Sequence, residues 1–138
     1  MTPFWKNWLT AWRLAVLAFG IVLAAAAIPA LDGPARWFYD LVHWPVDGRS
    51  SFDENVRFTC GILGAVTIGW ALTIFAAIEA AEKLGAPVWR ALTRAILVWY
   101  ALDSAISIAT GAPVNAISNT VLLATYLAPV LASKVLAR

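Results

Sequence analysis

The residue with the clearest potential for chemistry is Asp103, because it is a carboxylate within an otherwise apolar stretch. Residues 104–133 carry no charge at all, while Ser107 and Thr110 follow Asp103 on the same helical face. A carboxylate inside a membrane costs about 2.5–3.5 kcal/mol unless it is paired, neutral or hydrated. Asp103 therefore predicts polar partners close to it in the fold.

Candidate partners stand at the starts of two other apolar stretches. Asn115 and Asn119 follow a Gly-Ala-Pro turn at residues 111–113, which places them beside the residues just before that turn. Arg57 comes directly before another apolar run, and its long side chain can reach along that run. The sequence predicts a polar cluster of Arg57, Asp103, Asn115 and Asn119.

This cluster has two interpretations. In a structural one, the ion pair and the amide groups fix the register of the helices, because a charge inside a membrane needs a partner whatever its function. In a functional one, the cluster lines a pocket that binds a small polar group or passes a proton. Trp99 stands one helical turn before Asp103, so its ring either packs within the protein or stacks on a quinone, carotenoid or lipid.

Other reactive residue types lack the neighbours that catalysis requires. Cys60 is the single cysteine and His43 the single histidine, which excludes an intrachain disulfide and a cysteine- or histidine-rich metal site. Neither residue has a sequence neighbour that would activate a nucleophile, and no Gly-rich phosphate loop is present. We expect no enzyme activity and no metal site, and the sequence does not identify a cofactor.

The composition places all of these residues in a membrane. The 138 residues are 62% hydrophobic and only 13% charged, with a mean hydropathy of +0.76. Soluble domains are about half apolar and a quarter charged, so this chain cannot cover a surface that faces water. The net charge of +2 is too small for a nucleic-acid-binding domain. The sequence predicts a single integral membrane domain over residues 1–138.

Four apolar stretches are long enough to cross a bilayer as helices, since a crossing needs roughly 20 residues. The predicted fold class is all-α, an integral membrane four-helix bundle with a short outer amphipathic helix. The spanning helices are expected at about residues 14–31, 58–78, 89–110 and 114–135. The amphipathic helix is expected at about residues 34–44, where apolar and polar side chains recur with helical spacing.

Basic residues are divided unequally between the two ends of these helices. Seven of the ten lie on the side of the termini, namely Lys6, Arg13, Lys83, Arg90, Arg94, Lys134 and Arg138. The other three are Arg36, Arg49 and Arg57. Because cytoplasmic loops carry the excess of positive charge, the sequence predicts that both termini are cytoplasmic.

Tryptophans are expected to mark the membrane boundaries, where an apolar ring with a polar N–H is favoured. Those assigned to the cytoplasmic boundary are Trp5, Trp8, Trp12 and Trp89, and those assigned to the outer one are Trp37 and Trp44. The first three recur at helical spacing. We therefore expect the N-terminal segment to lie along the lipid headgroups before the first helix turns inward.

Small residues form a row in the second apolar stretch. Gly61, Ala65 and Gly69 are spaced by four, and Gly64 lies beside them. Such rows let helix backbones approach closely in lipid, where dispersion contacts replace the hydrophobic drive between helices. The row predicts a packing face, whose partner is either another helix of this chain or another subunit.

Residues 57–65 (Arg-Phe-Thr-Cys-Gly-Ile-Leu-Gly-Ala) open an apolar stretch after a polar loop, and a basic turn at 90–94 precedes Asp103. Over about residues 56–131 the chain resembles the DoxX-like small bacterial four-helix membrane proteins. The resemblance implies a compact bundle in a bacterial inner membrane and supports a pairing of Arg57 with Asp103. The Trp-rich segment at 32–53 has no counterpart in it.

The function predicted from these features is that of a non-catalytic accessory or structural subunit of the inner membrane. Its expected partners are membrane lipids and other membrane subunits, or further copies of itself in a homo-oligomer, and no nucleic acid. The alternative is a binding or transport module for a small hydrophobic ligand, a quinone, carotenoid or lipid, at the polar cluster. An enzyme acting on a lipid-like substrate is a third possibility.

Overall fold

The computed structural model describes residues 1–137, and within that range the chain forms five α-helices, one short 3-10 helix and no strand. The elements are α1 (Pro3–Ala25), η1 (Pro29–Leu31), α2 (Gly33–His43), α3 (Glu54–Leu84), α4 (Ala86–Ala109) and α5 (Pro113–Ala132). The all-α fold class expected from the sequence is confirmed. Arg138, one of the basic residues assigned to the side of the termini, lies outside the described residues.

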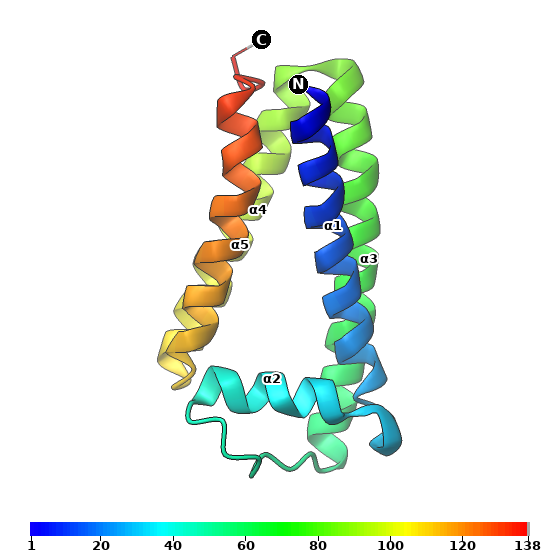
Figure 1. Cartoon of the computed structure of the whole chain (residues 1–138), viewed down its shortest axis with the longest axis vertical. Coiled ribbons are helices and arrows are strands. Elements are labelled where there is room, and N and C mark those ends of the chain that lie inside the picture. The colour runs from blue at the N-terminus through cyan, green and yellow to red at the C-terminus, as the bar shows by residue number, and fades with distance from the viewer. Residues whose placement is uncertain (138) are drawn as a thin grey trace.

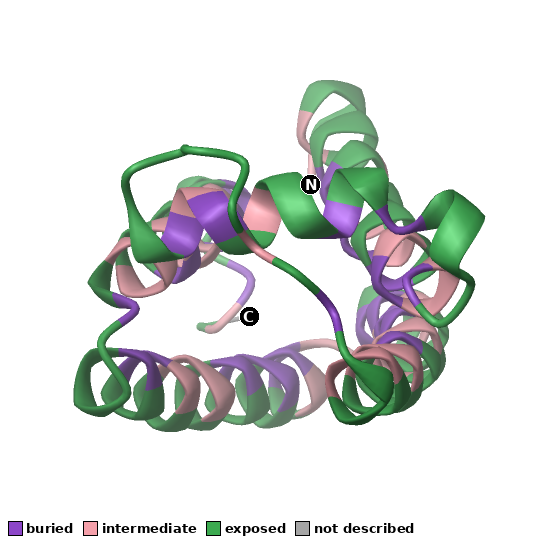
Figure 2. Cartoon of the chain, turned by 90° about the horizontal axis from the view of Figure 1, so that it is seen from below, coloured by how far each residue is buried: buried purple, intermediate pink, exposed green. Residues whose placement is uncertain are grey.

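The long helices are arranged as two pairs (Figure 1). α1 packs along α3, and α4 packs along α5. The pairs meet at the end where α1 begins and α5 ends, and they separate toward the other end, where α2 lies across the space between them. Seen from the α2 end, buried residues gather on the helix sides that face one another, and exposed residues cover the outer sides (Figure 2).

Within residues 1–137, four helices are long and apolar enough to cross a membrane: α1, α3, α4 and α5. At 1.5 Å per residue, the 31 residues of α3 extend about 46 Å and the 20 residues of α5 about 30 Å. Each therefore matches or exceeds a hydrocarbon core of about 30 Å. The chain is a multi-pass membrane protein.

The first spanning helix begins earlier than the predicted range of 14–31. α1 starts directly after Thr2, whose hydroxyl accepts a hydrogen bond from the Trp5 N–H at 3.5 Å and caps the first turn. Arg13 does not interrupt the helix, because its guanidinium lies over the Phe75 ring of α3, 4.4 Å from the ring centre. The separate N-terminal segment along the headgroups is therefore a wrong prediction, since those residues form the first turns of α1.

The other spans lie closer to their predicted ranges. Residues 58–78 fall within α3, and the range 89–110 nearly coincides with α4. The range 114–135 extends three residues beyond α5, and α2 lies within one residue of 34–44 at each end. α4 and α5 are joined at Gly111, whose φ of +82° is a left-handed conformation that favours glycine.

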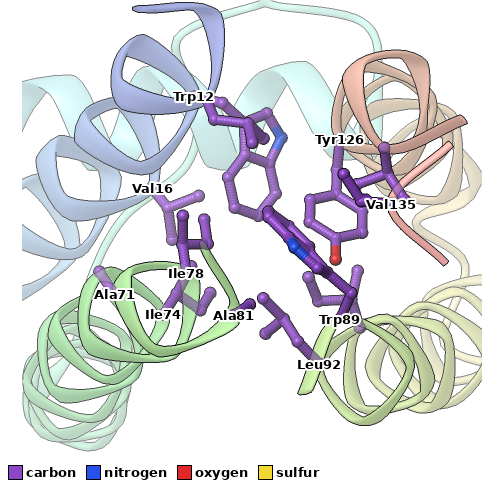
Figure 3. Close-up of a cluster of buried hydrophobic side chains, with 13 residues drawn as sticks. Trp12, Val16, Ala71, Ile74, Ile78, Ala81, Trp89, Leu92, Tyr126 and Val135 are labelled. Atoms are coloured by element: carbon purple, nitrogen blue, oxygen red, sulfur yellow. The ribbon is translucent and has the colours of Figure 1, made fainter. Parts of the chain in front are cut away.

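Two tryptophans assigned to the membrane boundary are buried in the hydrophobic core. Trp12 is 5% exposed and Trp89 is 3% exposed, and both lie near Tyr126 where the helix pairs meet (Figure 3). The ring centres of Trp12 and Tyr126 are 5.3 Å apart. The Trp12 N–H donates to the Leu122 carbonyl at 2.9 Å, and the Tyr126 hydroxyl shares a hydrogen bond of 3.0 Å with Thr93. Buried polar tips are thus paired, and the core joins α1, α3, α4 and α5.

A proline inside α5 explains the position of a third tryptophan. Pro129 has no backbone N–H, so the Thr125 carbonyl one turn earlier loses its helical partner. The Trp8 indole N–H donates to that carbonyl at 2.8 Å. An unpaired backbone group in lipid costs several kcal/mol. This contact therefore completes the hydrogen bonding of α5 and ties α1 to it.

α1 and α3 approach each other through small residues. The backbone at Ala24 of α1 lies directly against Gly64 of α3, which leaves no room for a Cβ there. A Cβ on Gly20 would lie 2.9 Å from the Ile68 nitrogen, and a Cβ on Gly61 would lie 3.1 Å from the nearest side chain. Glycine is required at this crossing because any side chain would push the two backbones apart.

The predicted packing row of α3 takes part only in its first half. Ala65 and Gly69 are exposed, and a Cβ on Gly69 would meet no atom within 4 Å. Positions four apart drift by about 40° around an α-helix at each step, so such a row leaves a straight contact line. The partner row of α1, Gly20 and Ala24, has the spacing typical of close helix pairs, but sequence reasoning did not identify it.

α2 packs against α1 and α5 at the end where the two helix pairs separate. Its buried residues include Ala35 and Val42, and its Phe38 ring contacts the Phe19 ring of α1, with ring centres 4.9 Å apart. Asp40 is buried on the same helix and accepts a hydrogen bond from the Ser50 N–H at 3.1 Å. That contact fastens the connection between α2 and α3 to α2.

We expect Gly64→Ala to lower the free energy of unfolding by about 1–3 kcal/mol, because the added methyl group overlaps the α1 backbone. The matched control is Gly69→Ala, where the space is open and alanine favours the helix. The measurement is reversible unfolding of both variants in mixed detergent micelles. Equal stabilities for the two variants would contradict the observed helix crossing.

A second prediction concerns how the 44–53 connection responds to low pH. Hydrogen bonds from Ser50, by its side chain and by its backbone N–H, lower the pKa of the Asp40 carboxyl below its ordinary value of 3.8. The ionised carboxylate therefore stabilises the 44–53 connection above about pH 4, and this contribution is lost as the pH falls through the lowered pKa. Amide hydrogen exchange at Ser50 should show more protection in the native protein than in Asp40→Asn at pH 7. The difference should shrink in acid, and equal protection at neutral pH would disprove the contact's role.

Candidate binding site at Asp103

Asp103 lies on α4, and the hairpin at Gly111 brings the opening turns of α5 beside it. Asn115 and Asn119 are one helical turn apart on α5, so both amides project toward the same stretch of α4. Six residues separate Asp103 from the end of α4, which places the carboxylate about 9 Å from that end. Asp103 is half-buried, while Asn119 is buried. The site thus sits between α4 and α5 toward the α2 end.

Two amide donors converge on one oxygen of this carboxylate. Asp103 Oδ1 accepts hydrogen bonds from Asn119 Nδ2 at 2.7 Å and from Asn115 Nδ2 at 2.9 Å. The single proton of the Ser107 hydroxyl is donated to the backbone carbonyl of Asp103 at 2.7 Å, and its 3.3 Å approach to Oδ1 is the weaker contact. The same amides also reach the serines of α4, since Asn115 donates to Ser107 at 2.8 Å and Asn119 to Ser104 at 3.4 Å. The hydroxyls and amides therefore form one network centred on Asp103 Oδ1.

The oxygens of this network that make no hydrogen bond with the protein are all hydrogen-bond acceptors. An ionised carboxylate accepts and does not donate, so each asparagine turns its NH2 group toward Asp103 and its carbonyl oxygen away from it. Among residues 1–137, no hydrogen bond reaches Asp103 Oδ2 or the amide oxygens of Asn115 and Asn119. Asp103 Oδ2 is not enclosed by the protein either, because it is absent from the buried unpaired atoms of that range. The free edge of the site can thus receive a donor or a cation.

The structure brings three of the four predicted cluster residues together, and Arg57 is not among them. Arg57 Nη1 pairs with Asp32 Oδ2 at 2.7 Å and donates to the Ala26 carbonyl at 3.3 Å. Asp32 is only 3% exposed and also pairs with Arg36 at 2.8 Å. The predicted pairing of Arg57 with Asp103 is therefore wrong, because a nearer and more buried carboxylate takes the guanidinium.

Trp99 lies one turn from Asp103 on α4, as predicted from its spacing, and it does not stand alone. Its ring stacks at a tilt on Trp70 of α3, with ring centres 5.3 Å apart. Both tryptophans are half-buried and pack against the edge of the hydrophobic core. On the α5 side of the same helix, the Tyr100 hydroxyl meets Thr120 at 3.1 Å. An aromatic pair thus flanks the polar network on the side of the core.

Sequence reasoning missed two residues of this region. Ser104 was recognisable, because it neighbours Asp103 and lies one turn before Ser107. Asp32 also carried a signal, since it directly follows the first apolar run just as Arg57 precedes the second, so both fall at one membrane boundary. Trp70 is an aromatic residue within a predicted crossing, but its pairing with Trp99 becomes visible only when α3 and α4 are placed side by side.

The remaining reactive side chains do not extend the site. His43 Nδ1 is hydrogen-bonded to the Tyr39 carbonyl of its own helix at 2.9 Å, and Cys60 is a free thiol in α3. In the described part of the chain, no three His, Cys, Asp or Glu side chains are grouped closely enough to hold a metal ion. The fold and the site together define a helical multi-pass membrane protein with one polar network between paired helices. No family model, curated protein or solved structure matches the chain.

Replacing Arg57 by leucine should lower the free energy of unfolding by about 3 kcal/mol, because Asp32 stays buried with a weaker set of partners. Arg49→Leu is the control, since Arg49 pairs with Asp47 at 3.4 Å in a largely exposed setting worth less than about 1 kcal/mol. Unfolding in mixed micelles at low salt distinguishes the two. Arg57→Leu with the stability of Arg49→Leu would show that the buried pair is dispensable.

Proposed function

We propose that this multi-pass membrane protein is a non-catalytic accessory subunit that docks a further transmembrane helix on the outward face of α3. The observation that carries the proposal is that the small residues of α3 face two different surfaces. Gly61 and Gly64 pack against α1 and the residues just after it, whereas Ala65 and Gly69 are exposed, with open space at Gly69. Thr73 and Ala76 continue this exposed face, which we call the α3 outer face, along the helix.

The α3 outer face has the properties of a helix-docking surface in lipid. Small side chains allow a second backbone to approach closely, and dispersion contacts then stabilise the pair. The docked helix comes from a different membrane subunit or from a second copy of this chain.

For the setting of this subunit, we propose a bacterial inner membrane with both termini in the cytoplasm. The excess of basic residues near the termini supports that orientation. α1 begins and α5 ends at the same end of the molecule, where Lys6 pairs with Glu82 at 3.2 Å and Arg90 donates to the Leu136 carbonyl at 2.9 Å. Basic side chains at this end also suit contact with anionic lipid headgroups. The DoxX-like resemblance stays a prediction beside these arguments.

A second candidate function is a binding or transport module for a small hydrophobic ligand at the Asp103 network. A specific observation favours it: one carboxylate oxygen of Asp103 accepts hydrogen bonds from two asparagine amides while the other is left without a partner in the described chain. A purely structural network gains nothing from an unpaired carboxylate oxygen at membrane depth. A ligand that completes this network would remove that cost.

The docking proposal is tested by placing bulk on the α3 outer face. Gly69→Leu should weaken association about tenfold, because the added side chain holds the incoming backbone away. Ala105→Leu is the matched control, since Ala105 is an exposed small residue of α4 outside this face. Native mass spectrometry of the protein extracted in mild detergent gives the fraction in assemblies and distinguishes a second copy from another subunit.

Equal assembly by the two leucine variants would contradict docking at this face. A chain that remains monomeric in mild extracts at every concentration would do the same. Loss of assembly in both variants would indicate a general effect of bulk on the lipid-facing surface, which would also count against a specific α3 interface.

A further inference from the structure

We propose that the Asp103 network binds a lipophilic cation, a positively charged nitrogen or phosphorus centre on an apolar body. This inference rests on the second candidate function and names its ligand class. It does not involve the α3 outer face, because Asp103 and its partners belong to α4 and α5. Three features of the site point to a cation: its uncompensated charge, its free acceptors and its aromatic wall.

The first feature is charge. Asp103 makes no salt bridge within 4.0 Å in residues 1–137, while Asp32 has two arginines. Neutral hydrogen bonds from Asn115 and Asn119 stabilise the carboxylate but do not cancel its charge. In the low dielectric of a membrane, a charge of this kind attracts an opposite charge far more strongly than it does in water. A cation is therefore the natural complement of the site.

The second feature is the direction of the hydrogen-bonding groups. Because the amide NH2 groups of Asn115 and Asn119 are committed to Asp103, the free edge of the network holds oxygen acceptors alone. A quinone offers only carbonyl oxygens, which are acceptors as well, and a carotene has no polar group to contribute. Of the ligand types that the sequence suggested, the neutral acceptors fit least well.

The third feature is the aromatic pair. Trp99 precedes Asp103 by four residues, about 6 Å along the axis of α4, and stacks on Trp70. Indole faces attract cations, and this attraction grows when the cation loses its water. Trp99 and Asp103 share one side of α4, so an extended ligand whose cationic centre lies at Asp103 Oδ2 can reach along the helix toward the Trp99 ring. The apolar body of the ligand would lie among the half-buried side chains that border the core.

The test uses the purified full-length chain and tetraphenylphosphonium as the probe, with binding followed by quenching of tryptophan fluorescence and by equilibrium dialysis. Tetraphenylborate has the same size and shape with the opposite charge, so it isolates the contribution of charge. We expect tetraphenylphosphonium to bind and tetraphenylborate not to bind at this site. Asp103→Asn should weaken binding of the cation by about tenfold or more, because it removes the charge but keeps an oxygen for the asparagines.

Asp47→Asn is the matched control, since it neutralises a carboxylate of the exposed connection and should leave binding unchanged. Trp99→Leu is the second variant. It leaves the charged network intact and should weaken cation binding by about fivefold. It therefore tests the proposal even if Asp103→Asn fails to fold, which circular dichroism and thermal melting would show.

The source of the cation is distinguished with lipid nanodiscs. If the ammonium group of phosphatidylethanolamine is the occupant, discs of that lipid should suppress tetraphenylphosphonium binding relative to discs of phosphatidylglycerol. If a free lipophilic cation is the occupant, phosphatidylethanolamine should not suppress tetraphenylphosphonium binding. Phosphatidylglycerol changes only the non-specific uptake of the probe by the lipid, and Asp103→Asn in the same discs measures that uptake. Either result supports a cation at Asp103.

Two outcomes would overturn the inference in different ways. Binding of dodecanol that depends on Asp103, with no preference for tetraphenylphosphonium over tetraphenylborate, would reject the cation and leave a binding module for a neutral donor. If no probe responded to Asp103→Asn or to Trp99→Leu in folded protein, the cation and the binding function would both be rejected.

Discussion

Arg57 forms an ion pair with the buried Asp32, and this ion pair holds together the α2 end of the molecule. The guanidinium at the start of α3 also donates to the Ala26 carbonyl just after α1 ends, so it joins three consecutive parts of the chain. Asp32 and Arg36 belong to the entry into α2. At a membrane boundary, where hydration is incomplete, a carboxylate this buried needs such partners.

Because Arg57 is taken, Asp103 must be stabilised by neutral groups. The α4–α5 hairpin meets that need by placing Asn115 and Asn119 one turn apart and by adding a serine hydroxyl from α4. These hydrogen bonds satisfy one oxygen of the Asp103 carboxylate but do not neutralise its negative charge. Asp32 and Asp103 thus illustrate two different answers to the same electrostatic cost: the charge of Asp32 is paired within the described chain, and that of Asp103 is not.

The sequence located four spans, the first of them with wrong bounds, and three of the four residues of the polar cluster, and the failures have physical causes. Hydropathy located the crossings because the hydrocarbon core constrains their length, but a charge such as Arg13 is tolerated inside α1 when an aromatic ring covers it. Spacing predicted that Asp103, Asn115 and Asn119 would meet, since a tight hairpin leaves little choice. For Arg57 the sequence offered more than one carboxylate as a partner, and the spacing of residues along one helix does not rank partners on others.

The two helix pairs are held together by different kinds of contact. α1 and α3 are pressed together by glycines, so their contact is close and apolar, and α3 keeps one smooth face free. α4 and α5 are held by hydroxyl and amide contacts at intervals along their length, from Thr93 and Tyr126 to the Asp103 network. The α3 outer face and the Asp103 network share no residue, although Trp70, which stacks on Trp99, directly follows Gly69 of the α3 outer face. A pair of helices in close apolar contact and a pair joined by polar contacts therefore coexist in one small membrane domain, and the two proposed roles divide between them.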